Sequence, residues 1–155
     1  MAGKLIIPIL LLLLVSNLIS ASKLTNVYYR FLTNEQLTRI PEFFTGREFT
    51  GSQLFYRTSN KKEGLYFFIP LNAQVDEIPD QVKVILSVIR SGEKKVEDFE
   101  FQILEISKTK KELLLGITGD DWNSKNVKPI AWKLVFEDLN NKMIFYKKSF
   151  LWDHE

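Results

Sequence analysis

Residues 81–104 read QVKVILSVIRSGEKKVEDFEFQIL, and the fold class is inferred from this segment. Every second residue from Val82 to Val88 is apolar, and apolar and polar residues alternate from Phe99 to Ile103. A period of two places one apolar row on one face of an extended segment. The break between the two halves is short, polar and contains Gly92, which suits a hairpin loop. The stretch therefore predicts the central hairpin of an antiparallel β domain.

Further extended segments flank this hairpin on both sides. Strands are predicted at residues 53–58, 65–71, 112–118, 130–137 and 142–152, and residues 27–31 form a short strand or an extended arm. In the last strand we expect Ile144, Tyr146, Phe150 and Trp152 to share a face. About seven strands separated by regular turn signals predict an all-β protein with a β-sandwich architecture.

This layout is similar to that of immunoglobulin-like and fibronectin type III domains over about residues 50–152. The resemblance implies an antiparallel sandwich and concerns architecture alone. The Cys…Trp…Cys spacing of true immunoglobulin domains is absent, because the chain has no cysteine. The resemblance therefore assigns no functional residue.

One short helix is predicted before the sandwich. Thr33 and Gln36 have the spacing of a capping box, and Pro41 is expected to end the helix because proline disrupts a helix interior. We expect a helix over residues 34–40 and a loop over residues 43–51. Leu37, Ile40 and Phe44 are expected to face the core.

The N-terminal segment has the layout of a secretory signal peptide. Lys4 precedes an apolar run over residues 5–19, and small and polar residues follow. An uncleaved membrane anchor is the alternative, although 15 helical residues span about 22 Å, less than the roughly 30 Å hydrocarbon core. The predicted organisation is a signal peptide or anchor at residues 1–21, an arm and short helix at 22–50, and a sandwich domain at 51–155.

Composition excludes several classes of function. The chain has 155 residues, 21 basic and 19 acidic side chains and a net charge of +2, which gives no general attraction to nucleic acid. The absence of cysteine excludes disulfides, thiolate catalysis and Cys-ligated metal. His154 is the only histidine, so the chain alone cannot supply a His-dependent triad or a multi-histidine metal site. No metal or cofactor is predicted.

Two groups of residues are candidates for ligand binding. Asp120, Asp121 and Trp122 lie in a predicted loop, where the carboxylates could help to bind calcium and the indole could stack on a sugar. Their ordinary interpretation is a solvated Asp-Asp turn with Trp122 folded back over the core. Tyr66 and Phe68 lie with Phe145 and Leu151 on the face opposite the main apolar row. We expect the helix and arm of the same chain to cover that face, and a partner is the alternative.

Neighbouring carboxylates do not suggest catalysis here. Three pairs of carboxylates are adjacent in sequence: Asp76 with Glu77, Glu97 with Asp98, and Asp120 with Asp121. Adjacent strand positions point to opposite faces, so such a pair does not form a facing acid and base.

The prediction is an exported, non-enzymatic β-sandwich, periplasmic or secreted, that binds an envelope or extracellular protein through loops or a strand edge. A carbohydrate-binding module that uses exposed aromatic side chains is the first alternative. A carboxylate-dependent hydrolase is the second.

Overall fold

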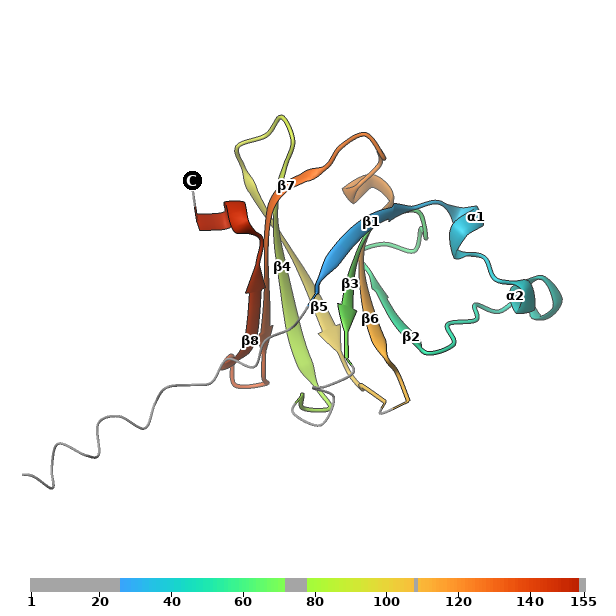
Figure 1. Ribbon diagram of the computed structural model, residues 1–155. Coiled ribbons are helices and arrows are strands. Elements are labelled where there is room, and N and C mark those ends of the chain that lie inside the picture. The colour runs from blue at the N-terminus through green and yellow to red at the C-terminus, as the bar shows by residue number, and fades with distance from the viewer. Residues whose placement is uncertain (1–25, 72–77, 108, 154–155) are drawn as a thin grey trace, which may run out of the picture.

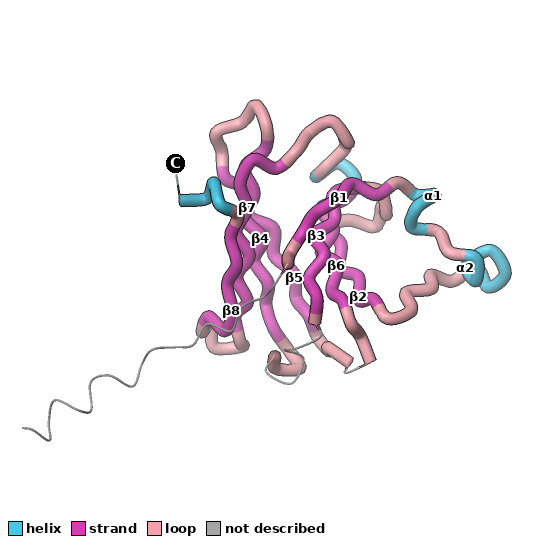
Figure 2. Tube along the Cα trace, viewed as in Figure 1, coloured by secondary structure: helices cyan, strands magenta, loops and turns pink. Residues whose placement is uncertain are grey.

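Two four-stranded β-sheets pack against each other in a sandwich-like arrangement (Figures 1 and 2). The structure is a computed structural model, and it describes residues 26–71, 78–107 and 109–153. The first sheet has the order β1-β3-β6-β2 and the second has the order β5-β4-β7-β8. The strands are β1 (Tyr28–Leu32), β2 (Gln53–Arg57), β3 (Gly64–Pro70), β4 (Val82–Arg90), β5 (Val96–Ile103), β6 (Glu112–Thr118), β7 (Pro129–Glu137) and β8 (Met143–Lys148).

The core lies between the two sheets and is built from alternate residues of their central strands. Val84 of β4 stands opposite Phe101 on one side and Phe136 on the other. In the first sheet, Phe67 of β3 pairs with Leu115 of β6. All five side chains are buried, which confirms the apolar row predicted for the central hairpin.

The strand count and the pairing differ from the prediction in two ways. The arm at residues 27–31 is a full strand, β1, which pairs with β3 from Tyr28 to Leu32, so the described part of the chain has eight strands. The sandwich is also not wholly antiparallel, because β2 runs parallel to β6. A parallel neighbour requires a long connection, and residues 58–111 separate these two strands.

The single predicted helix is two short helices, α1 (Asn34–Leu37) and α2 (Ile40–Thr45). Pro41 does not end a helix but lies in the first turn of α2, where its missing N–H removes no helical hydrogen bond. Leu37 is buried as predicted. The prediction that Ile40 and Phe44 face the core is wrong, because α2 lies beyond the edge of the sheet and leaves them 75% and 85% exposed.

The last predicted strand is shorter than expected. β8 ends at Lys148, and Phe150–Asp153 form the 3-10 helix η2. The expected phase is wrong, because the inward residue is Phe145 (3% exposed), opposite Phe136, while Tyr146 is 43% exposed. A register shift between Phe136 and Glu137 accounts for this, since one extra residue reverses which side chains point inward.

The predicted signal peptide or anchor lies outside the described residues. Within residues 26–71, 78–107 and 109–153, no helix has the length and apolar character needed to cross a membrane.

Candidate functional site

The connection between β1 and β3 is a long insertion, residues 33–63, which contains α1, α2 and β2. Its helices lie beside the first sheet, and α2 stands away from the strands (Figure 1). Leu37 of α1 packs with Tyr66, Phe68 and Leu114 on the outer face of the sheet, in a cluster separate from the main core. The second apolar face of β3 is therefore covered by the same chain, as predicted.

Tyr66 is the most enclosed side chain of this outer face, at 0% exposure. Its ring crosses Gly116 of β6, where an added Cβ would lie 2.6 Å from Tyr66 Cε1. The hydroxyl donates to the Lys62 carbonyl at 2.5 Å and accepts from Arg57 Nε at 2.6 Å. Burial raises the pKa of this phenol, so it stays neutral and anchors the insertion to the sheet.

Two ion pairs hold the insertion together. Arg57 Nη2 lies 2.5 Å from Glu48 Oε1, and Lys62 Nζ lies 2.9 Å from Glu42 Oε2. The hydrogen bond from Lys62 lowers the pKa of Glu42, and the one from Arg57 lowers the pKa of Glu48. Each carboxylate thus has a cationic partner, and the Glu42 side chain is only 8% exposed.

The opposite side of α2 is apolar and open. Ile40, Phe43 and Phe44 are 75%, 77% and 85% exposed, and we call them the apolar tip. The helix beneath them is fixed at its end, because Gly46 adopts a left-handed conformation with φ of 64° and its N–H donates to the Glu42 carbonyl at 2.9 Å. The side chains of the apolar tip are therefore exposed on a helix whose position is fixed by its C-cap and by ion pairs.

A hollow of about 180 Å³ opens on the outer face beside α1, and we call it the outer pocket. Phe68 and Leu114 form its floor and Tyr28 stacks on Phe68, with ring centroids 4.6 Å apart. Its lining comprises Tyr28, Arg30, Leu32, Gln36, Leu37, Arg39, Gln53, Phe55, Phe68 and Leu114.

The rim of the outer pocket is polar. Arg39 Nη2 donates to Gln53 Oε1, and Gln53 Nε2 donates to Glu112 at 2.7 Å. Tyr28 also donates to Glu112, at 3.4 Å, and burial raises the pKa of its phenol. Arg30 is exposed on the same rim, and within the described residues its guanidinium has no hydrogen-bond or ion-pair partner.

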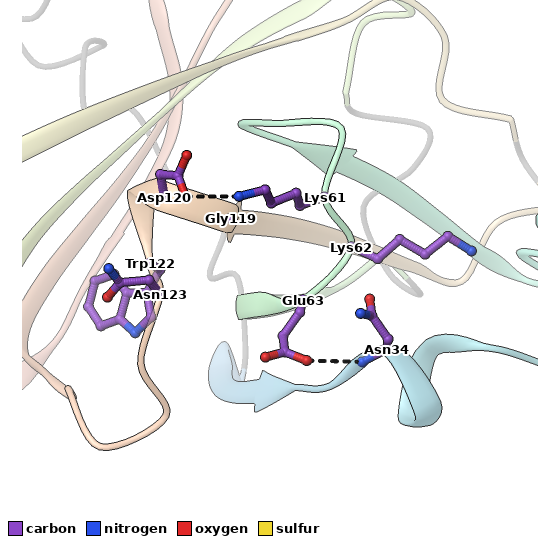
Figure 3. Close-up of a pocket in the computed structure, with 8 residues that line it drawn as sticks. All are labelled: Asn34, Lys61, Lys62, Glu63, Gly119, Asp120, Trp122 and Asn123. Carbon is purple, nitrogen blue, oxygen red and sulfur yellow. Dashed lines mark hydrogen bonds and ion pairs between the residues drawn. The ribbon is translucent and has the colours of Figure 1, made fainter.

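A second hollow, the end pocket, has a volume of about 340 Å³ and lies where the insertion meets the segment after β6 (Figure 3). Lys61 Nζ lies 2.9 Å from Asp120 Oδ1, and the Asn34 N–H donates to Glu63 at 3.4 Å. The Asp120 side chain is 93% exposed, so its ion pair is weak. The lining comprises Asn34, Lys61, Lys62, Glu63, Gly119, Asp120, Trp122 and Asn123.

Trp122 forms a wall of the end pocket but is only 1% exposed. Arg90 lies over its ring, 4.3 Å from the centroid, and the chain follows a 3-10 turn, η1 (Gly119–Asp121), that folds the indole inward. Its Nε1 has no hydrogen-bond partner among the described residues. The ordinary interpretation of Trp122 as a lid on the core is confirmed.

The five predicted ligand-binding residues do not lie together. Asp120 and Asp121 are exposed beside the end pocket, while Phe68 lies on the floor of the outer pocket and Tyr66 beneath the insertion. The carbohydrate-binding alternative requires exposed aromatic rings, and neither Trp122 nor Tyr66 supplies one, because both are at most 1% exposed. Sequence patterns missed Arg30 and Arg39, since a lone arginine in a strand or turn carries no motif.

Within the described residues, no group of three His, Asp or Glu side chains is placed to hold a metal ion. No family model, no curated protein and no solved structure matches this chain.

Proposed function

We propose that this protein is an exported, non-enzymatic interaction module that binds a partner protein through the apolar tip. The observation that carries the proposal is the exposure of Ile40, Phe43 and Phe44, at 75%, 77% and 85% on one six-residue helix. Aromatic side chains at the centre of an interface supply much of its binding energy. An exposed apolar cluster rimmed by polar residues is typical of protein interaction sites.

The tip is pre-organised for binding. The Glu42–Lys62 and Glu48–Arg57 pairs hold the polar side of the insertion, and the Thr45 hydroxyl donates to the Pro41 carbonyl at 2.9 Å. A fixed element loses less conformational entropy on association than a flexible loop does. This arrangement favours recognition of one defined partner.

Charge indicates the chemistry of the partner. Both acids of α2 and its following loop, Glu42 and Glu48, are ion-paired, whereas the Arg47 side chain is exposed and has no partner in the described part of the chain. Arg47 therefore gives the edge of the tip one unpaired positive charge, which fits an apolar groove with an acidic edge. Recognition of an anionic membrane surface typically requires clusters of four to eight basic residues, so we favour a protein.

We also propose an immunoglobulin-like, fibronectin type III-related topology. With β2 set aside, the remaining strands have the order β1-β3-β6 in one sheet and β5-β4-β7-β8 in the other. This corresponds to strands A-B-E and C′-C-F-G of an immunoglobulin-like sandwich. Residues 33–63 are then an insertion between strands A and B, a position suited to a binding function.

Export remains a proposal that rests on the apolar run at residues 5–19. Fractionation of cells that express the full chain with a C-terminal tag tests it. Recovery outside the cytoplasm at a mass reduced by about 20 residues supports a cleaved signal peptide. Retention of the full-length chain in the membrane fraction supports an anchor.

Chemical crosslinking in intact cells, followed by mass spectrometry, tests the interaction. Wild type should yield one reproducible crosslinked protein, and the F43S/F44S double variant should reduce its recovery at least about ten-fold. Leu139→Ser is the matched control, because Leu139 is 72% exposed on the other sheet's β7–β8 turn. Equal recovery from all three chains would overturn the proposal. Tip-dependent binding to anionic phospholipid vesicles, without a protein crosslink, would replace it with membrane binding.

A further inference from the structure

The outer pocket combines an apolar floor with a polar rim. Phe68, Leu114 and Leu37 are each at most 8% exposed, so the floor is a fixed part of the packed outer face. The volume of about 180 Å³ equals roughly six waters in the liquid. The pocket therefore has the size for one apolar group such as a phenyl ring or a branched aliphatic chain.

The free polar groups on the rim are hydrogen-bond donors. The Arg30 guanidinium has no hydrogen-bond or ion-pair partner among the described residues. Gln36 uses its amide oxygen to accept the Thr33 N–H at 3.1 Å, which leaves its NH2 group available. Arg39 already donates to Thr50 and Gln53, and its positive charge remains beside the pocket.

The neighbouring acceptors are already engaged. Gln53 Oε1 accepts from Arg39, and the two oxygens of Glu112 accept from Gln53 and Tyr28. Arg30 and Arg39 are the charged residues of the lining, and both are cationic. Glu112 lies beside the lining and offsets part of this positive charge.

We propose that the outer pocket binds an apolar carboxylate. The carboxylate accepts a forked pair of hydrogen bonds from Arg30 and a further bond from the Gln36 amide, while the apolar group packs on Phe68 and Leu114. Arginine is suited to this role, because its planar guanidinium matches the two oxygens of a carboxylate. The carboxylate belongs either to a free acid or to the C-terminal residue of a polypeptide. This site is independent of the apolar tip.

Titration calorimetry with the full chain tests the site. The free-acid probes are 3-phenylpropanoate and 4-methylpentanoate, and the polypeptide probe is the peptide Ala-Ala-Ala-Leu with a free C-terminus. The amide of each compound serves as its uncharged control. Binding of a carboxylate with no detectable binding of its amide is the expected result. Methyl NMR shifts of Leu37 and Leu114 locate the bound probe.

Arg30→Gln should weaken carboxylate binding about ten-fold or more, because it removes charged hydrogen bonds. Arg30→Lys should give an intermediate loss, since the charge stays but the fork is lost. Lys94→Gln is the control, because Lys94 is an exposed cation of the β4–β5 turn and lies outside the pocket. Unchanged affinity in Arg30→Gln would overturn the proposal.

The probes also distinguish the source of the carboxylate. Binding of the free acids alone identifies a small-molecule site. Binding of the peptide acid, with the free acids weaker, identifies a site for a protein C-terminus. Binding of neither, or equal binding of acids and amides, would overturn the proposal, because the donor-rich rim would then have no role in recognition.

Discussion

The outer faces of the two sheets are built from similar strands but meet different surroundings. In the first sheet, Phe68, Leu114 and Tyr66 form an apolar surface that the insertion covers. In the second sheet, the outward positions of the edge strand β5 are Asp98, Glu100 and Gln102, all exposed. One face is thus a small second core with pockets at its margin, and the other is solvated along its β5 edge.

Only part of the second sheet's outer face is covered by other segments of the described chain. Lys83 pairs with Glu137 at 2.8 Å across β4 and β7. At one end η2 packs on β7, with Lys133 Nζ 5.1 Å from the centroid of the Trp152 ring. An apolar outer face needs a covering element, whereas charged and amide side chains keep their hydration. This difference explains why the outer pocket and the apolar tip lie at the insertion beside the first sheet.

Truncation of one outward residue in each sheet is the strongest test of this comparison. Phe68→Ala should lower the free energy of unfolding by about 3 kcal/mol, because a buried ring leaves a cavity. Ile85→Ala, at a half-buried outward position of β4, should cost about 1 kcal/mol. Urea unfolding followed by circular dichroism measures both. Equal losses would mean that the two outer faces are equally packed.

Gly116→Ala should have the next largest effect, a loss of about 1–3 kcal/mol by overpacking. Its new methyl group would lie 2.6 Å from Tyr66 Cε1. Urea unfolding of Gly116→Ala, of Tyr66→Leu and of the double variant completes the measurement. If the ring is the obstacle, the alanine costs less in the Tyr66→Leu background than in wild type. An unchanged cost would place the strain elsewhere.

Acid pH should weaken the insertion beside the first sheet before it weakens the second sheet. The lowered pKa values of Glu42 and Glu48 mean that their contribution is complete above the ordinary value of 4.5 and is lost as the pH falls below it. The Glu137 hydrogen bond raises the pKa of Lys83, whose contribution is complete below 10.5 and is lost as the pH rises above it.

Hydrogen exchange, corrected for intrinsic rates, checks this prediction. At acid pH, protection should fall first in residues 39–57, and the ladder between β4 and β7 should persist. A simultaneous loss of protection in both regions would indicate global unfolding instead.

The smallest effect is expected on the solvated face. Val96→Thr, at a 45% exposed position of β5, should change the free energy of unfolding by less than about 0.5 kcal/mol. Threonine keeps the β-branched shape that suits a strand. Urea unfolding beside wild type measures the change. A loss above 1 kcal/mol would contradict the solvated character of this position.

The main elements were predictable where the apolar period was strong. The hairpin of β4 and β5 and the all-β class follow from alternation between Val82 and Ile103. The need to cover Tyr66 and Phe68 also followed, because β3 is apolar on both faces. The limits of α2 could not be predicted from the sequence, since Pro41 is compatible with both a helix end and a helix start. The end of β8 could not be predicted either.

The candidate sites were less predictable than the strands. Asp120 and Trp122 were identified from residue type, but the inward turn of Trp122 depends on η1 and on packing against Arg90. The outer pocket joins Arg30 of β1, Gln36 of α1 and Leu114 of β6. These positions are far apart in sequence, and no periodicity links them.

Residue types and their spacing are sufficient to predict the all-β class, the central hairpin, the absence of cysteine chemistry and the need to cover one outer face. These are properties of side-chain type and period, which act locally along the chain. The three-dimensional arrangement was needed to show the parallel β2–β6 pairing, the outward direction of Phe43 and Phe44, and the position of Arg30 beside an apolar floor. Those features depend on contacts between distant segments, because burial and exposure are set by the neighbours that the fold supplies.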